Sequence, residues 1–215
     1  MTLAPVPWWI DAVVGLIFGC AAYLAIQMSA AVCRGIEPFE DGPEPATPPA
    51  NLLIGCAALV GALAAARFYG ILPGHLLAIA LVVTALVACT YSDILCGIVP
   101  FYFTLVPLVL LLALDVAIAF VAHDYTLLIG AAIVTVPFAG AALFSKGIGM
   151  GWGDVKIVAM GGLLLGQPAI LVFAAAGVAA VVIAAIRKRR HEPIAFVPYL
   201  AGAIALAVAL PVFSV

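Results

Sequence analysis

Long apolar runs dominate this sequence and constrain its fold more than any other feature. Of its 215 residues, 67% are hydrophobic and only 8% are charged, whereas a soluble domain carries roughly 25% charged residues. A helix that crosses a bilayer needs about 20 predominantly apolar residues. The chain is therefore predicted to be an all-α, polytopic membrane helical bundle, and its charge balance gives no indication of nucleic-acid binding.

The hydropathy pattern predicts about eight transmembrane helices in a single membrane domain that covers residues 1–215. The sixth apolar run is short, and Gln167-Pro168 separates it from the seventh, because proline restricts the residue before it and ends helices. The eight predicted spans are 8–32, 51–67, 75–92, 98–121, 126–145, 154–166, 168–186 and 194–213.

Residues 34–50, with the sequence RGIEPFEDGPEPATPPA, form the only polar segment of any length. Prolines and acidic residues are frequent in it, and it has too few apolar residues to build a core. We interpret it as a short, flexible cytoplasmic linker between the first two spans.

Basic residues predict which face of the bundle is cytoplasmic. Arg34, Lys146 and the run 187–190 flank connections on one side of the eight predicted spans, and only Arg67 lies opposite. Because cytoplasmic loops are enriched in Lys and Arg, that side is predicted to face the cytoplasm.

Two acidic residues lie at this predicted cytoplasmic edge. Asp93 falls between the third and fourth spans, and Asp154 opens the sixth span after the glycine-rich stretch KGIGMGWG. Ionisable groups at membrane depth are costly and mark functional sites. Two facing carboxyl groups can share a proton, so that one acts as general base and the other as general acid in amide hydrolysis. A capping role is equally open, because Asp is a favoured N-cap residue and could begin the sixth or fourth span.

The other polar side chains offer no competing hydrolytic site. Asp115 lies deep in the fourth span and is either a buried hydrogen-bonded group or a secondary functional acid. A Ser/His arrangement is disfavoured, because His75 and His123 lie on the predicted outer side and His191 lies among basic residues, and the sequence contains no H-E-x-x-H motif. The five cysteines contain no C-x-x-C pair, so we predict no metal site and interpret them as small apolar side chains.

The segments around the two acids resemble the motifs of type IV prepilin peptidases, GxGD-type aspartyl proteases of the bacterial inner membrane. GWGDVK at residues 151–156 has the form G-x-G-D-x-K, and DILCGIVP at residues 93–100 resembles a D-x6-P signature that ends at Pro100. PIAFVPY at residues 193–199 is similar to the stretch before the last helix of the family. The resemblance covers residues 51–213.

This resemblance implies a membrane aspartic endopeptidase that removes the short, basic leader of prepilins or pseudopilins at the cytoplasmic face. It implies that Asp93 and Asp154 form the catalytic pair and that Gly151 and Gly153 let the loop carry Asp154 to its partner. Lys156 would tune the local field or anchor the loop, or it is a snorkelling anchor without a catalytic role. The implied partners are the precursor and membrane lipid, with no cofactor, and the sequence does not indicate an oligomeric state.

Many members of that family carry a zinc-binding domain between the first two spans, which methylates the new N-terminus. Here the 34–50 linker stands in its place and contains no cysteine pair. The chain therefore resembles the short, peptidase-only form that accompanies Flp/Tad-type pili.

Two other functions remain open from the sequence. A presenilin- or signal-peptide-peptidase-like protease uses a similar G-x-G-D, but its first acid belongs to a Tyr-Asp pair, whereas Ser92 separates Tyr91 from Asp93 here. A transporter or channel would place Asp93, Asp115 and Asp154 at different depths along an ion path. The separation of the Asp93 and Asp154 carboxyl groups distinguishes these functions.

Overall fold

Helices make up all regular structure in the part of the chain that the computed structural model describes, residues 7–34, 50–68, 73–144, 151–186 and 196–209. This confirms the predicted all-α bundle. The helices are α1 (Trp8–Arg34), α2 (Ala50–Phe68), α3 (Pro73–Cys96), α4 (Phe101–Ala122), α5 (Thr126–Phe144), α6 (Trp152–Leu165), α7 (Ala169–Ile186) and α8 (Val197–Ala209).

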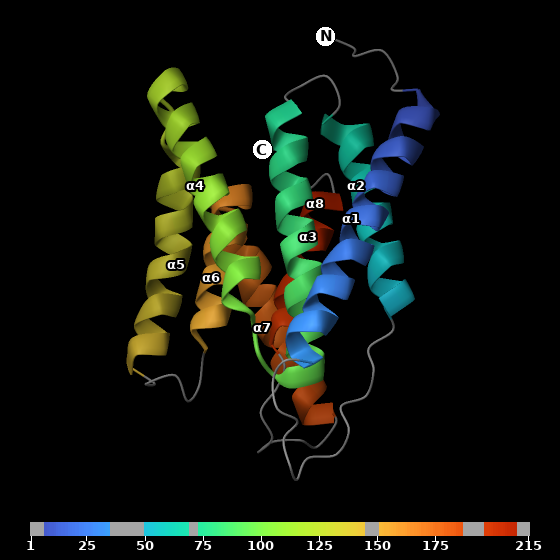
Figure 1. Cartoon of the computed structure of the whole chain (residues 1–215). Coiled ribbons are helices and arrows are strands. Elements are labelled where there is room, and N and C mark those ends of the chain that lie inside the picture. The colour runs from blue at the N-terminus through green and yellow to red at the C-terminus, as the bar shows by residue number, and fades with distance from the viewer. Residues whose placement is uncertain (1–6, 35–49, 69–72, 145–150, 187–195, 210–215) are drawn as a thin grey trace.

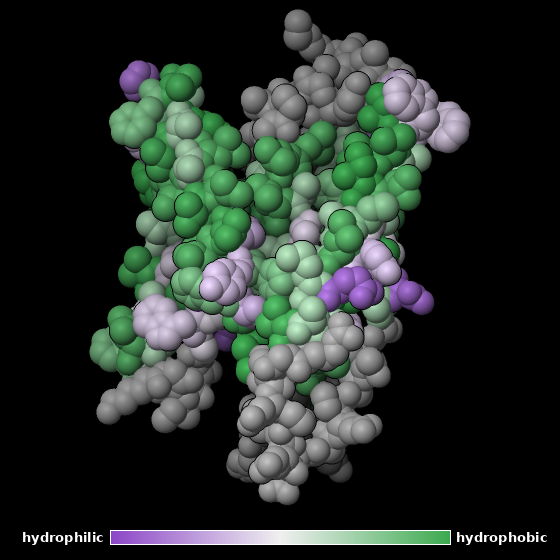
Figure 2. Space-filling model, in the orientation of Figure 1, coloured by the Kyte–Doolittle hydropathy of each residue, from purple (hydrophilic) through white to green (hydrophobic). Residues whose placement is uncertain are grey.

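The outer surface of the bundle is apolar, as expected of a protein surrounded by lipid. Helices α1, α3, α4 and α5 are long and apolar enough to cross a membrane, whereas α2, α7 and α8 contain shorter apolar stretches. Large hydrophobic side chains such as Leu16, Phe120 and Val136 are exposed. Figure 2 shows hydrophobic residues over most of the visible face between the two ends of the helices. We therefore treat the chain as a multi-pass membrane protein.

The predicted spans correspond one to one with the observed helices, with differences at their ends. The difference that bears on the site concerns the third span, which was predicted to end at residue 92 but continues as α3 to Cys96. Asp93 therefore lies in the last turn of a helix and not in a connection. The predicted break at Gln167-Pro168 is confirmed, because α6 is capped by Gly166 at φ 64° and α7 begins at Ala169.

Helix α3 stands between two groups of helices (Figure 1). The first group is α1 and α2, which pack on each other and on α3; the second is α4, α5 and α6, with α5 and α6 in close contact. Helix α8 contacts α2, α3, α6 and α7, so it helps to join the two groups. This arrangement lets residues of α3 meet residues of α6, although the two helices are separated by two further helices in the sequence.

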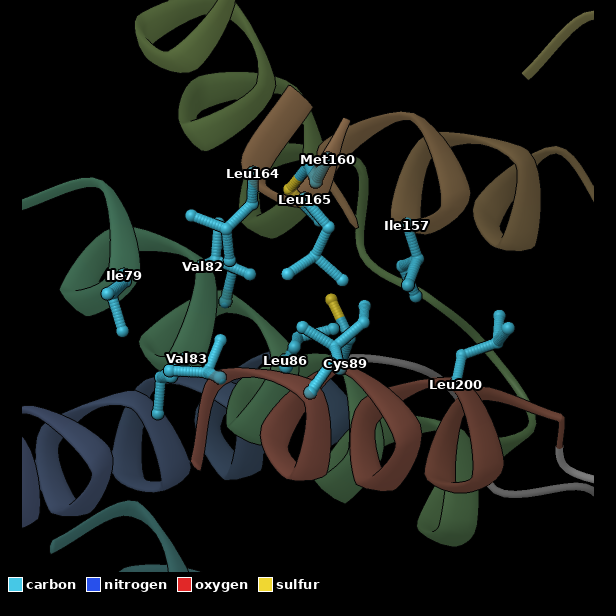
Figure 3. Packing of buried hydrophobic residues seen from close by; sticks show 14 of the residues in the cluster. Ile79, Val82, Val83, Leu86, Cys89, Ile157, Met160, Leu164, Leu165 and Leu200 are labelled. Carbon is cyan, nitrogen blue, oxygen red and sulfur yellow. The ribbon is translucent and has the colours of Figure 1, made fainter. Parts of the chain in front are cut away.

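The core lies where α3, α6 and α8 meet. Figure 3 shows Val82 of α3 beside Leu164 of α6, and Leu200 of α8 pointing toward Ile157 of α6. Burial of a Leu, Val or Ile side chain contributes roughly 1.5–3 kcal/mol in water-soluble proteins, but within lipid the packing itself has to hold helices together. This core fixes the relative positions of the helix ends that carry Asp93 and Asp154.

Small residues and one buried hydroxyl set the spacing between neighbouring helices. The Ser29 hydroxyl of α1 donates to the Ala88 carbonyl oxygen of α3 at 2.9 Å, which places the last turns of these two helices at the same end of the bundle. Between α5 and α6, a Cβ on Gly162 would lie 2.9 Å from Ala131 Cα. Glycine is therefore required there for the close approach of the two backbones.

A short turn joins α4 to α5 at the opposite end of the bundle from the last turn of α3. His123 caps α4 in the left-handed conformation at φ 54°. Thr126 donates from its backbone N–H and its hydroxyl to Asp124 Oδ1, and these bonds hold the pKa of the Asp124 carboxyl below its usual range. Asp124 thus has a structural explanation as a turn residue.

Candidate active site

Asp154 lies in the first turn of α6. Gly151 is the N-cap residue, with an extended backbone at φ −78° and ψ 151°, so Asp154 is the third residue of the helix. Its Oδ2 accepts a hydrogen bond from the Gly151 backbone N–H at 3.2 Å. This is the carboxylate half of a capping box, in which an acidic side chain reaches back to the N-cap N–H. The expectation that Asp154 would itself be the N-cap residue is therefore wrong, but it does cap the helix from within.

Gly153 allows this turn to touch the connection that follows α3. A Cβ on Gly153 would lie 2.7 Å from Val99 Cβ, closer than real Cβ atoms come to one another. Gly151 is different, because a Cβ there would meet no atom closer than Asp154 Oδ2 at 3.6 Å. Of the two motif glycines, Gly153 is therefore the one that the packing requires.

Asp93 lies half-buried in the last turn of α3 and contacts the start of α8. Its Oδ2 accepts a hydrogen bond from the Val197 backbone N–H at 3.3 Å, between residues 104 positions apart in the sequence. Val197 is the first residue of α8, where a backbone N–H has no partner within the helix. The expectation that Asp93 could cap the fourth span is wrong, since Pro100 is the N-cap residue of α4. Asp93 instead provides a hydrogen-bond acceptor for a backbone N–H in the first turn of α8.

Lys156 connects the acid-bearing turn of α6 to the first residue of α4. Its Nζ lies 4.2 Å from the centroid of the Phe101 ring, within the range of a cation–π interaction. The residues on either side of Pro100 therefore both contact α6: Val99 through Gly153, and Phe101 through Lys156. This geometry fits the interpretation of Lys156 as an anchor of the loop.

The two carboxyl groups lie close enough for their charges to repel each other. Both acids are half-buried, and each accepts from a backbone N–H at the start of a helix: Asp154 at α6 and Asp93 at α8. Helix N-termini carry a partial positive charge that stabilises nearby carboxylates. The site therefore combines two interacting acids with backbone donors that fix one oxygen of each.

Asp115 does not belong to this site. It lies 14 residues beyond Phe101 along α4, about 20 Å away at the rise of an α-helix. The side chain is 6% exposed, and its Oδ2 has no hydrogen-bond partner among the described residues. The structure thus brings Asp93 and Asp154 together and leaves Asp115 at a different depth.

The described residues contain no group of three or more His, Cys, Asp or Glu side chains that could hold a metal ion. The Cys33 thiol of α1 lies within hydrogen-bonding reach of the Cys96 thiol of α3, a pairing that the sequence did not predict. Within the described residues no further ligands accompany these two thiols, whereas a structural zinc site takes four ligands.

Three residues of the site were missed by the sequence analysis. Val197 donates to Asp93 through its backbone, Val99 touches Gly153, and Phe101 faces Lys156. The stretches that contain them were singled out by resemblance, but nothing local distinguishes these three positions. Backbone donors and apolar contacts leave no signature in residue type, so only the fold reveals them.

The arrangement is chemically suited to hydrolysis. Two carboxyl groups whose charges interact can divide the acid–base roles of hydrolysis, one accepting a proton from water and the other donating a proton to a leaving nitrogen. The half-buried setting limits the access of bulk water, which strengthens electrostatic interactions within the site.

Comparison with known proteins agrees with this chemistry. Residues 79–186 match the sequence model of the type IV leader peptidase family. The matched region begins in α3, ends with α7 and includes both acids, whereas Val197, which donates to Asp93, lies outside it. No curated protein and no solved structure matched the chain.

Proposed function

Since the chain belongs to the type IV leader peptidase family, we propose that it is an aspartic endopeptidase that removes the leader from prepilin-like precursors. Asp93 and Asp154 are its catalytic residues in this proposal. Only residues 35–49 separate α1 from α2, which supports the short, peptidase-only form and precursors of the Flp/Tad type. Gly151, Gly153, Lys156 and Pro100 support the geometry of the two acids.

The proposed mechanism uses one oxygen of each acid. The Oδ2 atoms are held by the backbone N–H groups of Gly151 and Val197, which leaves Oδ1 of each carboxyl group for water and substrate. The ionised acid accepts a proton from a water molecule while the oxygen of that water bonds to the scissile carbonyl carbon. The protonated acid then donates a proton to the leaving amide nitrogen as the C–N bond breaks. Neither step requires a metal ion or a cofactor.

The observation that carries this proposal is the contact between Gly153, next to Asp154 in α6, and Val99, in the connection that follows Asp93. This contact and the interaction of the two charges support a shared site. A transporter or channel would place Asp93, Asp115 and Asp154 at successive depths. Here only Asp115 lies at a different depth, which argues against a path of acids through the bundle. The Ser92 that separates Tyr91 from Asp93 argues against a presenilin-like protease, and the matched family argues for a leader peptidase.

We place the acids at the cytoplasmic side of the bacterial inner membrane. Arg34 ends α1 at the same end of the bundle as Asp93, because Ser29 and Ala88 join the last turns of α1 and α3. Lys146 and the basic run 187–190 lie outside the described residues but adjoin the start of α6 and the end of α7 in the sequence. Positive residues on this side support a cytoplasmic location.

The proposal is tested by co-expression of the chain with a prepilin precursor. The unaltered chain is expected to shorten the precursor on a gel, whereas Asp93→Asn and Asp154→Asn abolish cleavage. Asp124→Asn is the matched control, because Asp124 lies in the turn between α4 and α5. Immunoblotting of the membrane fraction establishes that all variants are present at equal amounts. Complete processing by either Asn variant would contradict the assigned roles.

A further inference from the structure

Two cysteine side chains meet where the last turns of α1 and α3 lie side by side (Figure 1). The thiol of Cys33 in α1 lies within hydrogen-bonding reach of the thiol of Cys96 in α3. Neither thiol takes part in the proposed mechanism. The part of the chain that the structure describes holds no third ligand that would turn the pair into a metal site. The pair is therefore explained neither by catalysis nor by metal binding.

The packing of α1 on α3 holds the two thiols together. The Ser29 hydroxyl, one turn before Cys33 on the same face of α1, donates to the Ala88 carbonyl oxygen of α3 at 2.9 Å in a buried contact. The two helices run in the same direction (Figure 1). Because helical side chains lean toward the N-terminus of their helix, the Cys96 side chain points back toward the level of Cys33. The contact between the thiols thus follows from the register of two packed helices.

Both thiols are accessible to a small oxidant. Cys33 and Cys96 are partly exposed, whereas Cys89, which precedes Cys96 in α3, is buried. A Cβ on Gly97, the residue after Cys96, would meet no atom within 4 Å, so the space beside this end of α3 is open. An uncharged molecule as small as hydrogen peroxide can therefore reach the two sulfur atoms from the end of the bundle.

The cytoplasm favours thiol pairs that cycle between two states. Disulfides are rare there because glutathione and thioredoxin reduce them, and those that form are mostly transient or redox-sensing. In the proposed orientation, the ends of α1 and α3 that carry Cys33 and Cys96 face the cytoplasm. Both are free thiols in the structure, as expected of the resting cell, and they are placed to be oxidised when peroxide accumulates.

We infer that Cys33 and Cys96 form a site of reversible oxidation, at which hydrogen peroxide converts the two thiols into a disulfide that ties α1 to α3. One thiolate attacks an oxygen of the peroxide and breaks the O–O bond, which gives a sulfenic acid and a hydroxide that takes up a thiol proton to form water. The neighbouring thiolate attacks that sulfur, and the S–O bond breaks with release of a second water molecule. The two sulfurs together lose two electrons, which reduce the peroxide to water.

The disulfide acts on the candidate active site through the last turn of α3. Cys96 lies three residues after Asp93, so the two side chains occupy neighbouring positions on one helical turn. Within the described residues, α1 packs on α2 and α3 and does not contact α6 or α8. A covalent S–S bond is shorter than a contact between two thiols. Oxidation therefore draws the end of α3 toward α1, away from the helices that carry Asp154 and Val197.

The first test maps the disulfide and does not depend on cleavage. The full chain in membrane vesicles is treated with hydrogen peroxide, the remaining thiols are alkylated, and the peptides are analysed by mass spectrometry with and without dithiothreitol. We expect a disulfide between Cys33 and Cys96 that dithiothreitol reverses. Recovery of these two residues as free thiols, or as separately oxidised sulfinic acids, would overturn the inference.

The second test measures cleavage of a precursor with a basic leader by the reduced and the oxidised chain, and this effect rests on the proposed function. Displacement of a catalytic group by about 1 Å can lower activity roughly 100-fold, so oxidation is expected to lower cleavage at least about tenfold. Dithiothreitol should restore it. Cys33→Ser and Cys96→Ser should each cleave as the unaltered chain does and should be insensitive to peroxide. Cys20→Ser is the matched control, because Cys20 is an exposed cysteine of α1, and this variant should remain sensitive.

The outcomes of the second test separate the redox site from the proposed function. An equal loss of cleavage in the unaltered chain and in both Cys33→Ser and Cys96→Ser would overturn the redox site, because peroxide would then act elsewhere. A mapped disulfide that leaves cleavage unchanged would overturn the link between this site and Asp93. Failure of the reduced, unaltered chain to cleave the precursor would instead overturn the proposed function and leave the mapped disulfide standing.

Discussion

The two acids of the site are held in similar ways by very different parts of the chain. Asp154 accepts from a backbone N–H three residues earlier, within the turn that begins α6. Asp93 accepts from the first N–H of α8, 104 residues away. One contact is complete once a single helical turn has formed, whereas the other requires α3 and α8 to pack together. The comparison teaches that half of the site is encoded locally and half depends on the assembled bundle.

Among changes that leave both acids in place, the largest effect is expected from disrupting the contact between Gly153 of α6 and Val99. In Gly153→Ala the new Cβ would collide with Val99 Cβ, and neither atom can rotate away because each is fixed to its backbone. Displacement of a catalytic group by about 1 Å can lower activity roughly 100-fold. We expect a loss of this size in leader cleavage, measured with purified protein in detergent.

Gly151→Ala is the control for this experiment, since its Cβ meets only ordinary contacts. It should retain cleavage within a few-fold. The double variant Gly153→Ala with Val99→Gly removes the colliding Cβ and should recover most of the lost activity. Equal losses in the two single alanine variants would show that the Val99 contact does not position Asp154.

The next largest effect is expected from removing the long-range contact between Asp93 and the start of α8. Val197→Pro removes the N–H that donates to Asp93, at the first position of α8, where helices accept proline. A hydrogen bond to a charged group contributes about 1.5–3 kcal/mol, so kcat is expected to fall roughly tenfold or more. Val197→Ala keeps the N–H and loses only the packing of the side chain, so it should retain more activity. A kcat for Val197→Pro equal to that of Val197→Ala would contradict the role of this N–H.

A smaller effect is expected at the link between α6 and α4. Lys156→Met removes the cation that faces the Phe101 ring, an interaction that contributes about 0.5–2 kcal/mol. The melting temperature should fall by a few degrees in a thermal unfolding assay, while Lys156→Arg keeps the interaction and the stability. If both variants unfold at the temperature of the unaltered chain, the contact does not anchor the loop.

The smallest effect is expected at the acid that lies outside the site. Asp115 Oδ2 is buried without a hydrogen bond within the described residues, and it lies far along α4 from Phe101. Asp115→Asn should leave cleavage within twofold of the unaltered chain and should not lower the melting temperature. A loss of cleavage like that of Asp93→Asn would assign Asp115 a functional role and favour a path of acids through the bundle.

The positions of the helices and the identity of the two acids could be predicted from the sequence for physical reasons. Apolar runs must be buried in lipid or in the core, so hydropathy located all eight helices to within a few residues of their observed ends. Glycines before Asp154 and Pro168 after Gln167 mark helix ends through backbone preferences. Both acids were singled out because ionisable groups are rare in such surroundings.

The contacts between residues that are far apart in the sequence could not be predicted in the same way. The bond from Val197 to Asp93 uses a backbone N–H, which every residue except proline has. Val99 and Phe101 act through their position against α6. Hydropathy places a residue within a span but does not say which neighbouring helix it faces.

The central claim, that Asp93 and Asp154 meet across the junction of α3 and α6, is tested most directly by cross-linking. In a chain whose native cysteines are replaced by serine or alanine, Asp93→Cys and Asp154→Cys are introduced together and treated with a short bifunctional thiol reagent. The account predicts an intramolecular cross-link in high yield, detected by mass spectrometry, and no cross-link when Asp115→Cys replaces Asp154→Cys. Absence of the link between positions 93 and 154 in folded protein would contradict the account.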